Sequence, residues 1–371
     1  MSQKEVAILD IGSKSITVLV GSQDVNKTIN IRGSYSENYE GFADGELLEP
    51  SKFERAIIEA VAGAERITGC KIKKIMVGIP TEFCFCVCKN VCQNFGKPKR
   101  ITNRDVENLF LAVKLEYKTH TVISKDAVYY VLGENNRVSD PVGLVDYKIT
   151  ACLSFVLASN KFLGQISKAL IKTNVEKFGF VSSAYTQALY LFDEAERDKY
   201  VLFVDCGYIT TTVALVRGRG VLCLSSFSMG GGYISADLAR CLRIPFSSAE
   251  SLNRKIVLCI KPEENDNYDI VIDGTVTPVS MRVANAIVES RVEVIAKGIL
   301  KCFESWQYNF PDFIPLYLTG GGLSFIKGAK DVIAKNIGKN VLIAQMPYSG
   351  LNKPNNSSSM SVLNYALSQG K

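Results

Sequence analysis

Histidine and tryptophan are nearly absent from this chain of 371 residues, which contains one of each. A single histidine argues against most histidine-based metal sites and against a histidine-dependent catalytic triad. No apolar run approaches the roughly 20 residues that span a bilayer, and the first ten residues lack the basic and apolar regions of a signal peptide. We therefore expect a protein of the cytoplasm, in which the 11 cysteines are reduced thiols.

The remaining composition is typical of a globular protein. Hydrophobic residues make up 47% of the chain and charged residues 22%. The net charge of +6 is too small and too scattered to indicate a nucleic-acid partner. This length is expected to form two domains, with enough buried apolar surface that neither a disulfide nor a metal is needed for stability.

The most informative pattern is an internal repeat. Residues 5–10 (EVAILD) form an apolar strand that ends at Asp10, and Gly12 and a second strand follow. Residues 200–205 (YVLFVD) repeat this pattern with Asp205, Gly207 and another apolar strand. The repeat implies two similar α/β halves that face one another.

Hydrophobic spacing also predicts the other elements. Helices are expected over residues 50–69, 102–118, 186–197 and 292–308, with Ser51 as the candidate cap of the first. A strand is expected over residues 83–91, and residues 134–143 are expected to be a polar turn region. The elements between residues 81 and 159 have the character of an α+β insert of their own.

The two Asp-x-Gly turns have a plausible chemistry. Glycine lets the backbone approach a phosphate, and successive N–H groups and hydroxyls donate to it. A carboxylate at each strand end can hold Mg²⁺ through water. Either turn alone is more often just a turn, but the two together, with the glycine turn at residues 320–322, favour a clamp around a triphosphate. That third turn could support a purine, or could simply need positive φ. The sequence contains neither a Walker A loop nor a Gly-x-Gly-x-x-Gly motif.

These motifs resemble the actin/Hsp70/sugar-kinase superfamily and, within it, the FtsA family of bacterial cell division proteins. The resemblance is carried by residues 10–15 (DIGSKS), 204–207 (VDCG), 230–237 (GGGYISAD), 249–250 (AE) and 318–322 (LTGGG). Residues 140–144 (DPVGL) and 291–293 (RVE) also match FtsA-like patterns. The resemblance implies an actin-like two-domain α/β fold of the duplicated ribonuclease H type, with an inserted FtsA-type subdomain 1C.

The resemblance also implies domain boundaries. Subdomain 1A would comprise residues 1–82, with 160–198 and 352–371 returning to it, and the inserted subdomain 1C residues 83–159. Subdomain 2A would comprise residues 199–228 and 292–351, and subdomain 2B residues 229–291.

The same resemblance implies an ATP or ADP site with Mg²⁺ in the cleft. Asp10 and Asp205 would hold Mg²⁺ through water. The expected nucleotide contacts are Asp10, Gly12, Ser13, Lys14, Ser15, Asp205, Gly207, Thr210, Thr211, Gly230, Gly231, Glu250, Arg254, Gly320, Gly321 and Gly322. Gln187 lies near the position of the water-positioning glutamine of actins and is the candidate catalytic residue, although an ordinary surface glutamine is the simpler interpretation.

The function implied by the resemblance is to form filaments and to link the FtsZ ring to the inner face of the cytoplasmic membrane at the division site. Arg240, Arg243 and Arg254 are candidate contacts for the acidic FtsZ tail. The last predicted core helix contains residues 360–367, and the basic amphipathic helix with which FtsA-like proteins bind membranes does not follow it in this sequence. Anchoring is therefore expected to be indirect or to need a helix outside this sequence.

Several residues depart from the family pattern. Tyr208 and Ile209 replace two glycines of the second phosphate loop, and Thr212 replaces its carboxylate. In the first loop Lys14 lies one residue earlier than the usual basic position, and Asn253 replaces a lysine that often contacts the base. These changes predict at most a weak ATPase, in which nucleotide acts mainly as a conformational ligand.

Two other functions remain open: a PilM-like scaffold of a pilus or secretion assembly, and an actin-fold small-molecule kinase. The loss of the carboxylate at Thr212 argues against a kinase, which needs a base beside the γ-phosphate. Cys84, Cys86, Cys88 and Cys92 alternate along one predicted strand, a pattern that favours partly buried thiols over a zinc site.

Overall fold

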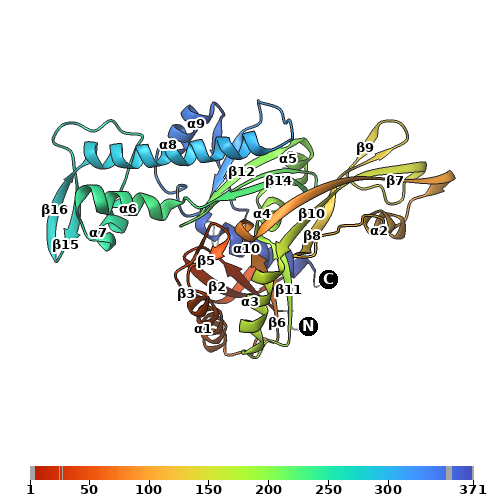
Figure 1. The fold of residues 1–371 in the computed structure, drawn as a ribbon, viewed down its shortest axis with the longest axis horizontal. Helices are drawn as coiled ribbons and strands as arrows, with labels where there is room; N and C mark the ends of the chain where they lie inside the picture. The colour runs from red at the N-terminus through yellow and green to blue at the C-terminus, as the bar shows by residue number, and fades with distance from the viewer. Residues whose placement is uncertain (1–4, 25, 27, 348–352, 370–371) are drawn as a thin grey trace.

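The computed structural model describes residues 5–24, 26, 28–347 and 353–369, and it contains two five-stranded sheets of the same topology (Figure 1). The first sheet has the order β3-β2-β1-β6-β11 and the second the order β14-β13-β12-β17-β18. The first comprises β1 (Val6–Ile11), β2 (Ser15–Gln23), β3 (Ile29–Asn38), β6 (Lys74–Ile79) and β11 (Lys177–Ser182). The second comprises β12 (Val201–Cys206), β13 (Thr211–Arg217), β14 (Gly220–Phe227), β17 (Leu316–Thr319) and β18 (Val341–Ile343).

Strand pairing is the same in the two sheets. In each, three consecutive strands form an antiparallel meander, a later strand pairs in parallel with its first strand, and a further strand pairs in parallel with that one. The sequence repeat predicted from Asp10 and Asp205 is therefore also a repeat of topology. Each parallel strand is reached through helices that cover the sheet, as parallel connections require.

Helices form layers on both faces of the sheets. The outer face of the first sheet carries α1 (Pro50–Thr68) and α3 (Asn160–Ile171), and the outer face of the second carries α6 (Gly231–Leu242), α8 (Met281–Ser305) and α9 (Ala329–Ile337). Between the sheets lie α4 (Ser183–Leu191) and α10 (Ser357–Ser368). Because strand side chains alternate, Ile8 packs in this central layer whereas Leu9 packs under α1.

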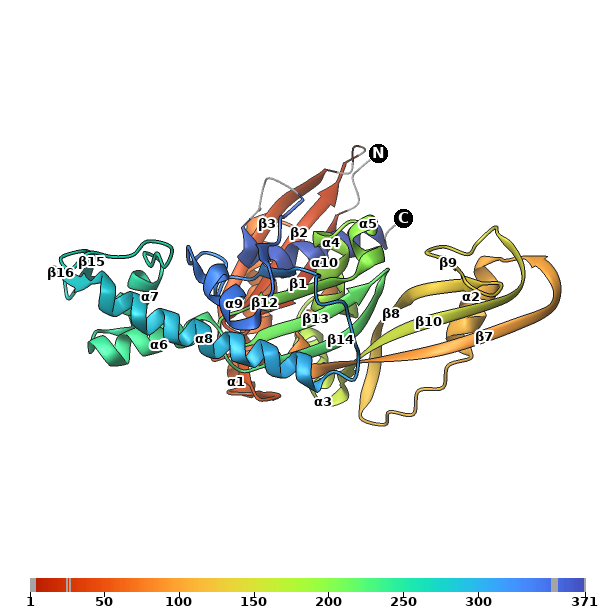
Figure 2. The same ribbon diagram turned by 90° about the horizontal axis from the view of Figure 1, so that it is seen from above.

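The insert forms a third sheet at one end of the molecule (Figures 1 and 2). Its order is β7-β10-β8-β9, from β7 (Cys84–Arg100), β8 (His120–Leu132), β9 (Asn136–Val138) and β10 (Val145–Ser159), with α2 (Asn103–Leu111). The insert packs against β14 of the second sheet, where the Ser154 hydroxyl donates to the Val221 carbonyl at 2.6 Å. The insert therefore lies between strands of the first sheet in sequence but packs against the second sheet in space.

A smaller unit lies at the opposite end (Figure 1). It contains α6, α7 (Phe246–Asn253) and the hairpin of β15 (Asn267–Ile272) and β16 (Thr275–Ser280). The helix α8 runs without interruption from this hairpin to the second sheet, so a domain boundary at residue 291 would fall inside one helix. The short elements are β4 (Phe42–Ala43), β5 (Glu46–Leu47), α5 (Glu194–Lys199) and the 3₁₀ turns Thr81–Phe83 and Pro354–Asn356.

Two helix predictions were wrong in extent. The single helix expected over residues 186–197 is two helices, because Asp193 and Glu196 form a capping box that begins α5. The helix expected over residues 102–118 ends at Leu111. The apolar residues beyond it, Val113 and Leu115, pack on the insert core without helical structure, which explains the misleading spacing.

Other boundaries also differ from the expectation. The strand predicted for residues 83–91 continues to Arg100, because β10 pairs with it along its length. The helix predicted for residues 292–308 begins at Met281, and the polar region 134–143 contains the short strand β9. Ser51 does not cap α1, which begins at Pro50, a residue favoured at the first helical position.

Candidate functional site

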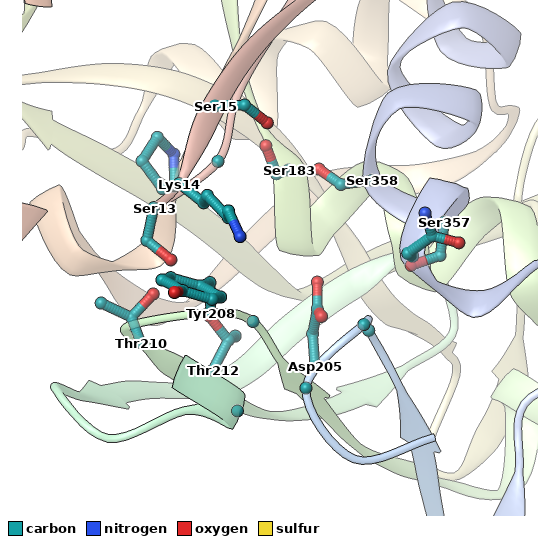
Figure 3. A pocket seen from close by; sticks show the side chains of 18 of the residues that line it. Ser13, Lys14, Ser15, Ser183, Asp205, Tyr208, Thr210, Thr212, Ser357 and Ser358 are labelled. Atoms are coloured by element: carbon teal, nitrogen blue, oxygen red, sulfur yellow. The ribbon is translucent and has the colours of Figure 1, made fainter. Parts of the chain in front are cut away.

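The two Asp-x-Gly turns have the same local geometry and line one cavity (Figure 3). In the first, Asp10 pairs with Thr17 across the hairpin, and the Gly12 amide donates to the Ser15 carbonyl at 3.0 Å. In the second, Asp205 pairs with Thr212, and the Gly207 amide donates to the Thr210 carbonyl at 2.9 Å. The repeated sequence therefore places two carboxylates and two glycine turns on the same cavity.

The cavity lies between the two sheets and has a volume of about 520 Å³, within the usual range for small-molecule sites. Of the expected nucleotide contacts, all line it except Thr211 and Gly230. Thr211 is fully buried, and its hydroxyl donates to the Met229 carbonyl at 2.6 Å. Gly230 precedes the first residue of α6. These two residues therefore have local structural roles, Thr211 in a hydrogen bond to the backbone and Gly230 at the start of α6.

Asp10 lies at the end of β1 and is held by the first turn of α10. The Ser358 hydroxyl donates to Asp10 Oδ1 at 2.6 Å. Burial raises the pKa of Asp10 to about 6; the Ser358 hydrogen bond lowers it in part, and the Asp205 carboxylate raises it. An ionised Asp10 therefore costs the unliganded protein free energy, which a bound cation would relieve.

Asp205 is held by Gln187, which sequence analysis interpreted most simply as a surface glutamine. That interpretation was wrong: Gln187 is 1% exposed and its Nε2 donates to Asp205 Oδ2 at 2.6 Å and to the Ser357 hydroxyl at 3.0 Å. Burial raises the pKa of Asp205, and the hydrogen bond from Gln187 opposes that rise. Gln187 therefore lies in the cavity lining beside one of the two carboxylates.

The carboxylate pair suits a magnesium ion held largely by water. Within the described ranges, no salt bridge involves Asp10 or Asp205, and no cluster of three or more histidine, cysteine or acidic residues could hold a metal. Mg²⁺ typically takes one or two carboxylates and keeps several waters or ligand oxygens. Two half-buried carboxylates without a salt-bridge partner in that part of the chain fit that mode better than a closed all-protein site.

The glycine turns are required by close packing around the cavity. Gly320 has φ +87°, and a Cβ there would lie 2.2 Å from Asp205 Oδ1. A Cβ on Gly231 would lie 2.5 Å from the Gly322 Cα. Gly320 therefore needs positive φ, which was the simpler of the two interpretations of this turn. The turn also lines the cavity in which the purine is expected.

The altered second loop contributes Tyr208, Thr210 and Thr212 to the lining of the cavity. The Tyr208 hydroxyl donates to Glu250 Oε1 at 3.0 Å, and Lys14 Nζ donates to the same oxygen at 2.7 Å. Burial raises the pKa of Tyr208 to about 12. Although burial alone would raise the pKa of Glu250, the hydrogen bonds from Lys14 and Tyr208 lower it. Of the two residues that replace glycines in this loop, Tyr208 therefore contributes its side chain to the site, whereas Ile209 does not line the cavity.

Sequence analysis missed the contribution of the C-terminal segment. Asn355, Ser357 and Ser358 line the cavity, as do Ser183 and Thr81. The available signal was the run of polar residues 355–359 (NNSSS) at the start of the last helix. Helix starts favour such residues for capping, so the run gave no reason to expect a ligand site.

The other candidate residues are placed as follows. Arg254 lines the cavity, whereas Arg240 and Arg243 are exposed at the end of α6. Cys84, Cys86 and Cys88 are half-buried and Cys92 is exposed. The Cys86 and Cys88 thiols donate to the carbonyls of Leu222 and Val221 at 3.5 Å, so these cysteines pack the insert against β14, as expected for thiols.

Comparison with known proteins identifies the relatives of this chain. The family model "Cell division protein FtsA" matches residues 202–361. The FtsA protein of Enterococcus hirae is 24% identical over an alignment of 371 residues, gaps included, that covers 96% of this chain and 82% of the relative. The resemblance to FtsA inferred from the motifs is therefore confirmed over almost the whole chain.

Solved structures show the same fold. The type IV pilus biogenesis complex PilM-PilN matches with a TM-score of 0.61 at 12% identity, covering 98% of this chain and 99% of that one. MreB5 of Spiroplasma citri bound to ADP matches with a TM-score of 0.56 at 11% identity, covering 99% and 97%. These likenesses confirm the actin-like fold. None of the helices in the described residues has the length and apolarity to cross a membrane.

Proposed function

Because this chain is a relative of the FtsA cell division proteins, we propose that it is an actin-like cell division protein whose cleft binds an adenine nucleotide. The observation that supports this most is the pair of matching turns, which bring Asp10 and Asp205 to one cavity between the sheets. ATP or ADP would bind there with Mg²⁺ and act mainly as a conformational ligand.

The chemistry of the lining suits a nucleotide. Ser13 and Thr210 offer hydroxyls, Lys14 offers a cation for phosphate, and Asp10 and Asp205 would hold Mg²⁺ through water. The glycine turn 320–322 leaves room for a flat base against the backbone. The ADP-bound MreB5 structure shares this fold, which supports the choice of ligand.

Turnover is expected to be slow. Thr212 stands where the family pattern has a carboxylate, and it lines the cavity. Gln187, the candidate for positioning water, already donates to Asp205 and to Ser357. A kinase would need a free carboxylate base near the terminal phosphate. Both carboxylates deep in the cavity instead accept hydrogen bonds, which favours ligand binding over phosphoryl transfer.

The proposed partners are the C-terminal tail of FtsZ, further copies of this chain in a filament, and the inner face of the cytoplasmic membrane. The unit of α6, α7 and the β15–β16 hairpin is the proposed site for the FtsZ tail. Arg240 and Arg243 are exposed there and could attract an acidic peptide. Arg254 lines the cavity, so we assign it to the nucleotide before the peptide.

Calorimetry with ATP and Mg²⁺ tests the nucleotide site. We expect wild type to bind and Asp10→Ala to bind at least tenfold more weakly, because the variant loses a magnesium-side carboxylate. Asp273→Asn, an exposed change in the β15–β16 turn, is the matched control and should bind like wild type. Equal affinities for wild type and Asp10→Ala would contradict the assignment of the pocket.

A second function shares the fold and needs its own experiment. The match to PilM-PilN leaves a PilM-like scaffold as the alternative, whose partner would be a short peptide of an inner-membrane protein. Retention of this protein on immobilised FtsZ tail peptide, but not on a PilN-type peptide, is the result expected for a division protein. The opposite selectivity would favour the scaffold.

A further inference from the structure

The Tyr208 side chain contacts two other residues of the cavity lining, Glu250 and Lys14. It lies in the turn between β12 and β13, and its hydroxyl reaches Glu250 on α7 at 3.0 Å. Lys14, from the turn of the first sheet, donates to the same Glu250 oxygen at 2.7 Å. Its ammonium also lies 4.2 Å from the centre of the Tyr208 ring, and Figure 3 shows the two side chains together inside the pocket. We call Lys14, Tyr208 and Glu250 the cross-cleft cluster.

A second set of contacts joins the same two turns. The backbone amide of Ile209 donates to the Ser13 hydroxyl at 2.9 Å. In a phosphate-binding turn this N–H would be a donor to the ligand. The Ile209 side chain extends toward Gly41, where an added Cβ would lie 2.7 Å from Ile209 Cδ1. The two turns therefore contact one another directly, through the hydrogen bond from Ile209 to Ser13.

Each member of the cross-cleft cluster has chemistry that a nucleotide would use. Lys14 is a cation suited to phosphate, and Glu250 is an acceptor suited to sugar hydroxyls. In this structure Lys14 is paired with Glu250, and Glu250 also accepts a hydrogen bond from the Tyr208 hydroxyl. A nucleotide that used these groups would have to break the Lys14–Glu250 pair and displace the phenol.

We propose that Tyr208 is an internal competitor of the cleft ligand: by holding Glu250 and lying against Lys14, it keeps both groups from a nucleotide and sets a low affinity for it. This proposal rests on the nucleotide-binding function proposed above. A protein whose competent state is a minor one binds with an affinity reduced by that fraction. Nucleotide would therefore bind weakly, and its binding would be coupled to release of Tyr208 from Glu250.

The proposal predicts opposite effects on stability and affinity. Tyr208→Phe keeps the ring and removes the hydrogen bond to Glu250, so it should lower the melting temperature of the unliganded protein and tighten ADP–Mg²⁺ binding about tenfold. Tyr208→Gly removes the competing ring as well and should tighten binding further. A tyrosine with a purely structural role would lower the melting temperature without tightening binding.

Calorimetry with ADP and Mg²⁺, with thermal unfolding of the unliganded proteins, is the test. Tyr147→Phe, at an exposed position near the start of β10, is the matched control and should change neither quantity. If wild type binds ADP–Mg²⁺ and both Tyr208 variants bind it with the same or a lower affinity, the competition is refuted and the nucleotide function stands. Absence of binding in wild type and in both folded variants would overturn the nucleotide function, and the competition with it.

Discussion

Gln187 Nε2 donates to Asp205 Oδ2 at 2.6 Å, so a helix between the two sheets touches the carboxylate of the second turn. The same amide nitrogen donates to Ser357 at the start of α10. Ser358, the next residue, donates to the carboxylate of Asp10. One short polar network therefore joins both carboxylates through α4 and α10.

The first prediction concerns this network. Gln187→Ala should lower the free energy of unfolding by about 1–3 kcal/mol, because the half-buried carboxylate of Asp205 loses a hydrogen-bond donor. Urea unfolding followed by circular dichroism measures the change. Gln345→Ala removes an exposed glutamine and should stay within about 0.5 kcal/mol of wild type. An equal loss in the two variants would show that the network contributes no stability.

The second prediction concerns the free-energy cost of ionising the half-buried carboxylate of Asp10. The folded-state pKa of Asp10 is raised to about 6, so ionisation at pH 7.5 opposes folding. Asp10→Asn should raise the free energy of unfolding of the unliganded protein by about 1–2 kcal/mol and weaken binding of Mg²⁺–ATP. Thermal unfolding with and without ligand tests both. A variant that is less stable without ligand would contradict the assignment.

The third prediction is a pH dependence in the insert. Lys99 and then Thr102 donate to Asp105 at the start of α2 and lower the pKa of its carboxyl to about 2, against the opposing effect of burial. A lowered pKa means that the ionised form stabilises the native state, so this stability is complete above about pH 4 and is lost as the pH falls toward 2.

Asp105→Asn should therefore lower the free energy of unfolding by about 1 kcal/mol at pH 7, the usual value of a helix cap. The difference from wild type should shrink between pH 4 and pH 2, as the wild-type carboxyl becomes protonated. Urea unfolding at a series of pH values measures it. A difference that does not change with pH would show that the charge of Asp105 contributes nothing.

The fourth prediction tests the contact between the insert and the second sheet. Gly218 has φ +57°, and a Cβ there would lie 2.1 Å from the Val128 carbonyl oxygen on β8. Gly133 has the same φ, but its nearest neighbour would be 3.7 Å away. Gly133→Ala should cost about 1 kcal/mol for the left-handed backbone alone. Gly218→Ala should cost more and expose the insert to limited proteolysis. Equal losses of stability in the two variants would show that the insert and the second sheet can accommodate the added methyl group without a further cost.

The sequence predicted the repeated features well because they are local. An apolar strand, a carboxylate and a glycine in two copies indicated the paired turns and the α/β halves. The motifs indicated the actin-like fold. Helix ends were predicted poorly where the competing signal was tertiary, as with Val113 and Leu115, which keep an apolar spacing outside any helix.

The parts of the site that sequence reasoning missed depend on long-range contacts. Gln187 looks like an ordinary helix residue until β12 and α10 are placed beside it. Ser357 and Ser358 look like helix-start residues until Asp10 and Gln187 are brought to them. Tyr208 was recognised as a departure from the glycine pattern, but its partner Glu250 lies 42 residues away on another element.

The contact of the insert with β14 has a mechanical consequence for the cleft. The Ser154–Val221 bond and the two thiol contacts tie the edge of the second sheet to a unit that is continuous in sequence with the first sheet. If they persist while the cleft widens, rotation must occur about an axis near them. The largest displacement would then fall at the opposite end of the molecule, where the β15–β16 hairpin lies (Figure 1). The hairpin would be the place where a small change around the ligand becomes a large movement.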